Sequence, residues 1–283
     1  MVSTAHTDLQ LKTADGLRLH LSRWEATVPV CGTVLVIPGK GEHGGRYTRL
    51  ADCLAPMGWR VWGLDLRGQG RSEGPPARVD RFGQFLIDVE AALEGLGNTG
   101  KDRPVVLLGY SMGAVVATLA ALEWPERIRG LICVSPAFSI ENRLPRATKV
   151  AMHLLNWLAP HRILTREYNP ARVTTDVREQ ERIAADPLIN GITRARLVSE
   201  LRRAGRLCIV RAERLTLPTL VLLAPVDAVV EVAGTRQFFD RLGSNDRMLK
   251  EYADCRHDLL HDHRSAQVQS DIQSWLQQRY VSR

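Results

Sequence analysis

The distribution of hydrophobic residues predicts a chain in which short buried strands alternate with helices. Strand-like runs, most of them uninterrupted apolar residues, occur at 33–37, 60–64, 105–108, 130–134, 217–224 and 248–253. Helical spacing of apolar residues occurs at 47–57, 82–96, 114–124 and 265–280. Near the start, polar and apolar residues alternate on both sides of Asp15-Gly16, which indicates an antiparallel hairpin over residues 8–24. This order predicts an α/β fold with a mostly parallel central sheet and helices on both faces.

The alternation stops between residues 139 and 215. This segment contains no strand-like run, only amphipathic helical stretches separated by Pro145, Pro160, Pro170 and Pro187. Because strand patterns resume afterwards, we interpret the segment as an insertion into one core. The predicted parts are a first core part (1–138), a helical insertion (139–215) and a second core part (216–283).

The composition is that of an ordinary soluble globular protein, with 45% hydrophobic and 24% charged residues. No stretch is apolar enough to span a bilayer, and the N-terminus lacks the basic and apolar pattern of a secretion signal. The five cysteines are scattered and show no Cys-x-x-Cys spacing, which argues against a disulfide framework and a zinc site. We therefore expect a cytoplasmic protein without a metal or other cofactor.

The net charge of +7 comes entirely from one part of the chain. Residues 141–215 contain 15 Lys or Arg and 8 Asp or Glu. Since these charges alternate in sign at helical spacing, a solvated helical face is favoured over an anion-binding surface. The basic residues lack interleaved aromatic residues, and the chain has no nucleic-acid motif, so we expect no nucleic-acid partner. The sequence leaves the oligomeric state open.

Ser111 lies at a sharp reversal between the strand at 105–108 and the helix that follows it. It is the central residue of Gly109-Tyr110-Ser111-Met112-Gly113, which fits the Gly-x-Ser-x-Gly nucleophile elbow. The serine backbone of such an elbow is strained, and only glycine leaves room two positions before and after it. We predict that Ser111 is a catalytic nucleophile.

A serine nucleophile needs a base, and the base needs a carboxylate that orients it. In an open parallel sheet these partners come from loops at the carboxyl ends of strands. Asp227 follows the strand at 217–224, and His257 follows the strand at 248–253. The order Ser111, Asp227, His257 is that of the α/β-hydrolase triad. Competing candidates are His261 and His263 for the base, and Glu231 and Asp254 for the acid.

The oxyanion hole is expected to use two backbone amides. One belongs to Met112, which follows the nucleophile, and the other belongs to Lys40, in the glycine-rich loop after the strand at 33–37. The Lys40 ammonium either attracts an anionic substrate or extends to water. We expect the second, because lysine side chains commonly extend their charge into solvent.

The chain resembles the monoacylglycerol lipase-like branch of the α/β-hydrolases, which is grouped with lysophospholipases and serine aminopeptidases. The resemblance spans nearly the whole chain and is carried by GKGEHGGRY (39–47), DLRGQGRSEG (65–74), GYSMG (109–113), DPL (186–188) and the Asp227 and His257 loops. It implies an α/β-hydrolase fold in which the helical insertion forms a lid over Ser111. It also implies hydrolysis of a carboxylic ester of a lipid-like alcohol through an acyl-enzyme.

The chain departs from the family pattern at four places. It has Pro38-Gly39 where the family usually has His-Gly, and Gly68-Gln69-Gly70 where the family usually has Gly-His-Gly. Ala114 replaces a glycine after the elbow, and residues 223–227 differ from the usual His-Gly-x-x-Asp. None of these differences removes a member of the triad, but Pro38 offers neither a backbone donor nor an imidazole.

The insertion is expected to determine the substrate. It contains an apolar stripe that either lines an acyl channel or packs the lid on the core: Leu144, Val150, Ala151, Leu154, Leu155, Trp157 and Leu158. Of these we predict Leu154, Leu155, Trp157 and Leu158 as substrate contacts.

The expected partner is a small lipid-like ester of the monoacylglycerol or lysophospholipid type, or a medium-chain ester. A transient contact of the lid with a membrane surface is a further expectation. The same triad also supports amide or peptide hydrolysis and acyl transfer. A further alternative is a protein of this fold that binds its ligand without turnover.

Overall fold

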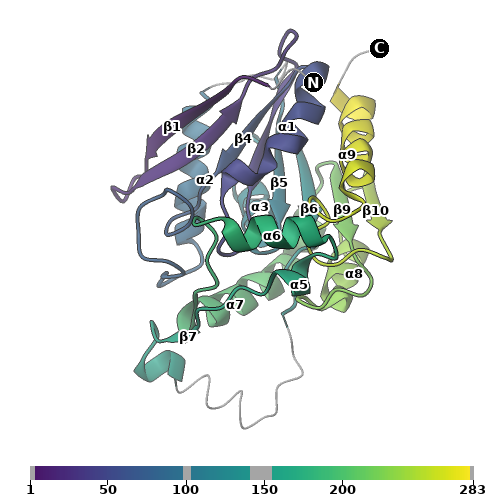
Figure 1. Ribbon diagram of the computed structural model, residues 1–283. Coiled ribbons are helices and arrows are strands. Elements are labelled where there is room, and N and C mark those ends of the chain that lie inside the picture. The colour runs from purple at the N-terminus through teal and green to yellow at the C-terminus, as the bar shows by residue number, and fades with distance from the viewer. Residues whose placement is uncertain (1–3, 98–102, 141–154, 281–283) are drawn as a thin grey trace.

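A sheet of eight strands forms the centre of the computed structural model, which describes residues 4–97, 103–140 and 155–280 (Figure 1). The strand order is β1-β2-β4-β3-β5-β6-β9-β10, in which β1 and β2 pair antiparallel, β2 and β4 pair antiparallel, and the remaining pairs are parallel. The strands are β1 (His6–Lys12), β2 (Arg18–Trp24), β3 (Gly32–Ile37), β4 (Trp59–Leu64), β5 (Val105–Tyr110), β6 (Gly130–Val134), β9 (Thr219–Leu223) and β10 (Arg247–Glu251). The predicted mostly parallel α/β sheet is therefore confirmed, and so is the hairpin at Asp15-Gly16.

Helices cover both faces of this sheet. The helices α1 (Thr48–Leu54) and α9 (Ser265–Tyr280) pack on one face, and α2 (Gln84–Gly95), α3 (Met112–Glu123) and α8 (Val232–Asp240) pack on the other. Short 3-10 turns lie at η1 (Gly44–Tyr47), η2 (Ala55–Met57) and η3 (Ala212–Arg214). The sheet has a hydrophobic core on each face, and alternate residues of β3 point into one or the other. Val34 and Val36 face α1 and α9, whereas Leu35 and Ile37 face α2 and α3. The sequence analysis did not identify α8.

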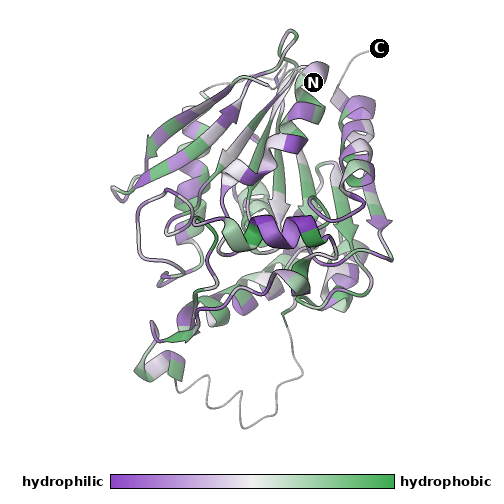
Figure 2. Ribbon diagram, in the orientation of Figure 1, coloured by the Kyte–Doolittle hydropathy of each residue, from purple (hydrophilic) through white to green (hydrophobic). Residues whose placement is uncertain are grey.

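The central strands are mostly apolar, with the sequences VVLLGY in β5 and GLICV in β6 (Figure 2). Every residue of β3, β5, β6 and β9 is buried. In α3, ten of twelve residues are buried, because α7 covers the side of α3 that faces away from the sheet. Uninterrupted apolar runs are the pattern that such double coverage requires.

The segment between β6 and β9 lies at the end of the sheet toward which the arrows of the parallel strands point (Figure 1). It contains β7 (Ile163–Thr165), α5 (Pro170–Val173), α6 (Val177–Ala185), β8 (Thr193–Arg194) and α7 (Ala195–Arg211). Our expectation of helices alone was wrong, since β7 and β8 form a small antiparallel pair. These strands have three and two residues, which is too short to produce a periodic pattern. The predicted boundaries of the insertion at 138/139 and 215/216 stay predictions.

Across the described ranges, we find no helix with both the length and the apolar character needed to cross a bilayer. The most apolar helix of the core, α3, has only twelve residues. The predicted cytoplasmic location stays a prediction.

Candidate active site

Ser111 lies at the turn between β5 and α3, in a backbone conformation that side chains rarely adopt. Its φ of 53° and ψ of −117° lie outside the broad allowed regions. A Cβ at Gly109 would lie 2.4 Å from Ala114, and one at Gly113 would lie 2.0 Å from the carbonyl oxygen of Ile37. Both glycines of the motif are therefore required by close backbone packing, which is the physical reason proposed from the sequence.

His257 and Asp227 lie beside Ser111, on the loops after β10 and β9. Nε2 of His257 is 2.8 Å from Oγ of Ser111, and Nδ1 of His257 is 2.6 Å from Oδ2 of Asp227. The second carboxylate oxygen of Asp227 accepts hydrogen bonds from the backbone amides of Val229 and Val230, at 2.7 and 3.1 Å. These bonds fix the carboxylate, which in turn orients the imidazole toward the serine.

The competing candidates have other partners. His261 contacts the Asp258 carboxylate and the carbonyl of Arg46, and His263 contacts Asp254 at the surface. Glu231 accepts a hydrogen bond from Ser139. The structure thus brings together the predicted Ser111, Asp227 and His257 and places these alternatives elsewhere.

The Gln69 side chain fixes the loop that carries Lys40 by hydrogen bonds to its backbone. The Gln69 amide donates to the carbonyl of Gly39 at 3.2 Å, and its oxygen accepts from the N–H of Gly41 at 2.7 Å. Because C=O and N–H of a trans peptide point in opposite directions, holding the Gly39 carbonyl toward Gln69 turns the Lys40 N–H away from Gln69. Gly39 itself lies against Ser111, since a Cβ at Gly39 would be 3.4 Å from that of the serine.

The turn-rich segment 65–72 forms the support for this loop. One carboxylate oxygen of Asp65 accepts from the N–H of Gly44 at 2.6 Å, and the other accepts from the N–H of Arg71 at 2.8 Å. Gly70 has a φ of +53°, and a Cβ there would lie 2.1 Å from the Asp65 carboxylate. The same Cβ would lie 2.7 Å from Cβ of His43, so glycine at this position lets the segment approach the loop closely.

The second predicted oxyanion donor, Met112, is the first residue of α3. Amides of the first helical turn have no partner within the helix and carry a partial positive charge. The amide of Met112 is thus available beside Ser111, whereas the role of both amides stays a prediction.

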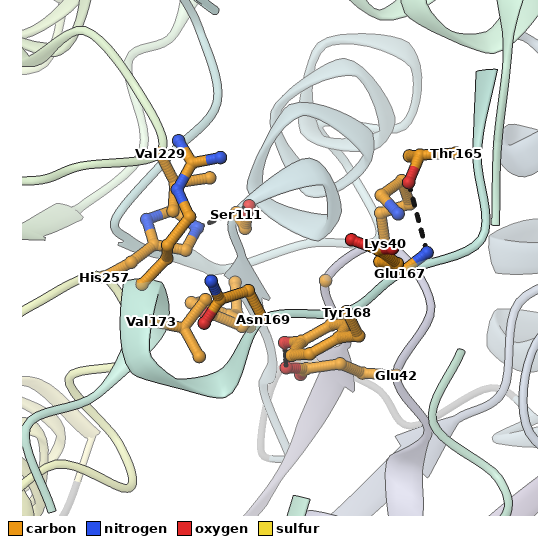
Figure 3. A pocket seen from close by; sticks show the side chains of 13 residues that line it. Lys40, Glu42, Ser111, Thr165, Glu167, Tyr168, Asn169, Val173, Val229 and His257 are labelled. Carbon is orange, nitrogen blue, oxygen red and sulfur yellow. Dashed lines mark hydrogen bonds between the residues drawn. The ribbon is translucent and has the colours of Figure 1, made fainter. Parts of the chain in front are cut away.

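A cavity of about 350 Å³ lies over Ser111 and His257 (Figure 3). Its core side includes Gly39, Lys40 and Tyr110. Its other wall comes from the insertion and the Asp227 loop, and consists of Thr165, Glu167, Tyr168, Asn169, Arg172, Val173 and Val229. The sequence analysis missed Tyr168 and Arg172, because their side of the insertion depends on folding against the core and not on a local motif.

Lys40 does not extend to bulk water, contrary to the sequence-based expectation. Its Nζ lies 3.5 Å from the carbonyl oxygen of Gly191 and 3.4 Å from that of Ile192, both in the insertion. Burial lowers the pKa of Lys40 to about 8, although the charge of Glu42 opposes this shift. The reason for the difference is the segment before β8, which covers the side chain.

Three of the four predicted substrate contacts, Leu155, Trp157 and Leu158, lie away from the cavity. Trp157 and Leu158 are 78% and 70% exposed, and neither they nor Leu155 line the cavity. Residues 155–158 form a short helical stretch before β7, here called the outer end of the insertion (Figure 1). Leu154, together with Leu144, Val150 and Ala151 of the stripe, lies outside the described residues.

The insertion is joined to the core by a buried ionic network centred on Arg46. The guanidinium contacts Glu42 at 2.5 Å, Asp258 at 2.8 Å and Glu179 of α6 at 2.9 Å. Burial disfavours the charge of Asp258, but His261 and Arg46 outweigh it and hold its pKa below the ordinary value. Glu179, Asp258 and His261 cluster closely enough to bind a metal ion, yet Arg46 already supplies the positive charge there.

A second contact joins two of the sequence motifs. Nε2 of His43 lies 2.8 Å from the carboxylate of Asp186, the first residue of the DPL sequence. Burial opposes ionisation of Asp186, but the hydrogen bond from His43 lowers its pKa. The motif at 39–47 therefore carries the Lys40 loop at one end and contacts the insertion at the other.

Comparison with known proteins identifies the family. The family model described as serine aminopeptidase, S33 matches residues 28–264. Monoglyceride lipase of Rattus norvegicus is 31% identical over 281 residues, with 95% of this chain and 90% of that protein covered. Monoacylglycerol lipase of Mycolicibacterium smegmatis is 27% identical, with 98% and 99% covered.

The fold agrees with this result. A soluble variant of monoglyceride lipase from Saccharomyces cerevisiae, solved with a substrate analogue, matches with a TM-score of 0.87 at 22% identity, covering 100% of this chain and 98% of that one. The predicted α/β-hydrolase fold and the predicted enzyme class, a serine carboxylic-ester hydrolase, are confirmed. The chain belongs to the serine aminopeptidase S33 family, in the monoacylglycerol lipase-like branch of the α/β-hydrolases.

Proposed function

We propose that the protein hydrolyses monoacylglycerol-type esters through an acyl-enzyme on Ser111. The observation that carries this proposal is the continuous hydrogen-bonded relay from Ser111 through His257 to Asp227, which opens into a cavity. A serine hydroxyl is a weak nucleophile, and a neutral imidazole at hydrogen-bonding distance is the group that activates it.

In the first half of the reaction, His257 takes the proton of Ser111 as its oxygen attacks the ester carbonyl. The amides of Lys40 and Met112 stabilise the negative charge that develops on the carbonyl oxygen. His257 then gives the proton to the departing alcohol, and Asp227 stabilises the imidazolium in between. In the second half, water replaces the alcohol and releases the carboxylic acid.

Support for the substrate class comes from the names of the relatives and from the lining of the cavity. Tyr110, Val173 and Val229 provide apolar surface for an acyl chain, whereas Lys40 and Asn169 provide polar groups for the alcohol. Amide hydrolysis and acyl transfer use the same relay and differ only in the leaving group or the acceptor.

The test is labelling with a fluorophosphonate probe and turnover of p-nitrophenyl esters from acetyl to palmitoyl, alongside monoacylglycerol. Ser111→Ala should abolish labelling and lower turnover by about 10⁴-fold or more. Ser274→Ala, which removes an exposed hydroxyl on α9, is the control and should retain both. If the native protein is neither labelled nor active, it binds its ligand without turnover and the proposal fails.

A further inference from the structure

The ammonium group of Lys40 is half-buried and has no anion in direct contact among the described residues. Its only polar contacts there are the long ones to the carbonyls of Gly191 and Ile192, at 3.5 and 3.4 Å. An ammonium has three donors, and burying it without an opposite charge is costly. The side chain also lines the cavity that contains Ser111 and His257.

Neither acidic group that lines the cavity forms an ion pair with Lys40. The charge of Glu42 favours the ammonium from a distance, but the contacts of its carboxylate are made elsewhere. Glu42 is paired with Arg46 at 2.5 Å and accepts a hydrogen bond from the Tyr168 hydroxyl at 2.8 Å. Glu167 lines the same cavity but is exposed, and it forms no ion pair with Lys40. The cavity thus presents an ammonium group that no carboxylate of the described residues contacts directly.

We propose that Lys40 forms a subsite for an anionic group of the substrate, so that the preferred substrates are esters that carry a phosphate or a carboxylate close to the scissile bond. This inference rests on the proposed function, because it places the anion next to the ester that Ser111 attacks. It changes the expected substrate from a neutral acylglycerol to a charged one.

The covalent structure of Lys40 determines where the anion lies. The backbone amide of this residue is the predicted oxyanion donor, and the ammonium is attached to it by a four-carbon stem. The positive charge therefore remains within one side-chain length of the reacting carbonyl. A phosphate on the alcohol reaches it from the leaving-group side, and a terminal carboxylate reaches it from the acyl side.

The experiment compares two matched substrate pairs. Monolauroylglycerol and its phosphate monoester test the alcohol side, and mono-p-nitrophenyl adipate and its methyl-capped diester test the acyl side. In each pair the ratio of kcat/KM for the anionic over the neutral ester is measured, because effects on the shared chemistry cancel in the ratio. Native protein should favour the anionic member of at least one pair.

Lys40→Met should lower that ratio about tenfold or more, the size expected for a hydrogen bond to a charged group, and mainly through KM. Lys40→Arg keeps the charge and should restore most of the ratio. Lys12→Met removes an exposed lysine of β1 and should leave it unchanged. An equal ratio in the native protein and Lys40→Met would overturn the subsite and leave Lys40 as a tether to the insertion.

A second measurement separates the subsite from catalysis. Dodecyl phosphate, below its micelle concentration, should raise the midpoint of thermal unfolding more than neutral dodecyl glycerol ether does, and this difference should vanish in Lys40→Met. If no ester is hydrolysed but the difference is present, the proposed function fails and the anionic subsite stands. If esters are hydrolysed and the difference is absent, the subsite fails alone.

Discussion

The loops around Ser111 and the outer end of the insertion are held in opposite ways. The loop at 39–44 is fixed by side chains that bond its backbone, with Gln69 on Gly39 and Gly41 and Asp65 on Gly44. At the outer end of the insertion, Trp157 and Leu158 expose most of their surface. Polar groups that are buried and fully bonded determine a unique geometry, whereas exposed apolar side chains have no partner within the described chain to do so.

The inner end of the insertion, like the loops around Ser111, is held by buried polar contacts. There, Glu179 and Asp186 form ion pairs with Arg46 and His43 of the core. The insertion is thus anchored to the core by these ion pairs and by the apolar packing of α7 on α3, whereas Trp157 and Leu158 at its outer end face solvent.

The largest effect is expected from removing the cation of the buried network. Arg46→Met leaves Glu42, Asp258 and Glu179 as buried carboxylates without their guanidinium, which should lower the free energy of unfolding by about 3–5 kcal/mol. Urea denaturation measures this loss. Arg18→Met is the matched control, because its pair with Glu73 is exposed and should contribute at most about 1 kcal/mol. Similar losses for the two variants would show that the network does not anchor the insertion.

Replacing Gln69 should affect stability less than replacing Arg46, and its main effect should be on catalysis. Gln69→Leu releases the carbonyl of Gly39 and thereby the direction of the Lys40 N–H, so kcat should fall about tenfold to a hundredfold with little change in KM. Gln84→Leu is the control, since Gln84 also caps backbone amides but lies away from the cavity. A change in KM alone would contradict this role.

The variant Gln69→Glu tests whether Gln69 acts by donating a hydrogen bond to the Gly39 carbonyl or only by filling space. An ionised glutamate still accepts from the N–H of Gly41, but it repels the carbonyl of Gly39. Only the protonated form can donate to that carbonyl as the native amide does. The activity of this variant relative to that of the native protein should therefore rise as the pH falls, whereas a purely structural role predicts a ratio that does not depend on pH.

The pH dependence of substrate preference is the next effect in size. The pKa of Lys40 is lowered to about 8, so its positive charge is present below that pH and is lost as the pH rises through it. The preference for an anionic over a neutral ester should fall severalfold across this range, and Lys40→Arg should keep it. The other charged or titratable groups facing this cavity are Glu42, Tyr110, Glu167, Tyr168, Arg172 and His257. They are common to both proteins, so a decline of equal size in Lys40→Arg would contradict the assignment.

The regions that the sequence predicted well are those determined by local rules. The positive φ of Ser111 and the close packing of Gly109 and Gly113 follow from the motif itself, and the buried strands follow from their apolar runs. The bonds of Gln69 and the pairing of Ile163 with Arg194 join segments far apart in the chain. An amphipathic stripe does not specify which surface will cover it, and for this reason Trp157 was assigned to the substrate although it faces solvent.

The smallest effect is expected from removing the exposed apolar side chains at the outer end of the insertion. If this surface contacts lipid, Trp157→Ser combined with Leu158→Ser should lower turnover of monoacylglycerol in anionic vesicles roughly fivefold, because less apolar surface enters the interface. Turnover of soluble p-nitrophenyl acetate should stay the same, since neither side chain lines the cavity. Val210→Ser, at another exposed apolar position on α7, is the control. An equal loss on both substrates would mean instead that the outer end shapes the cavity from a distance, and that the two regions are coupled after all.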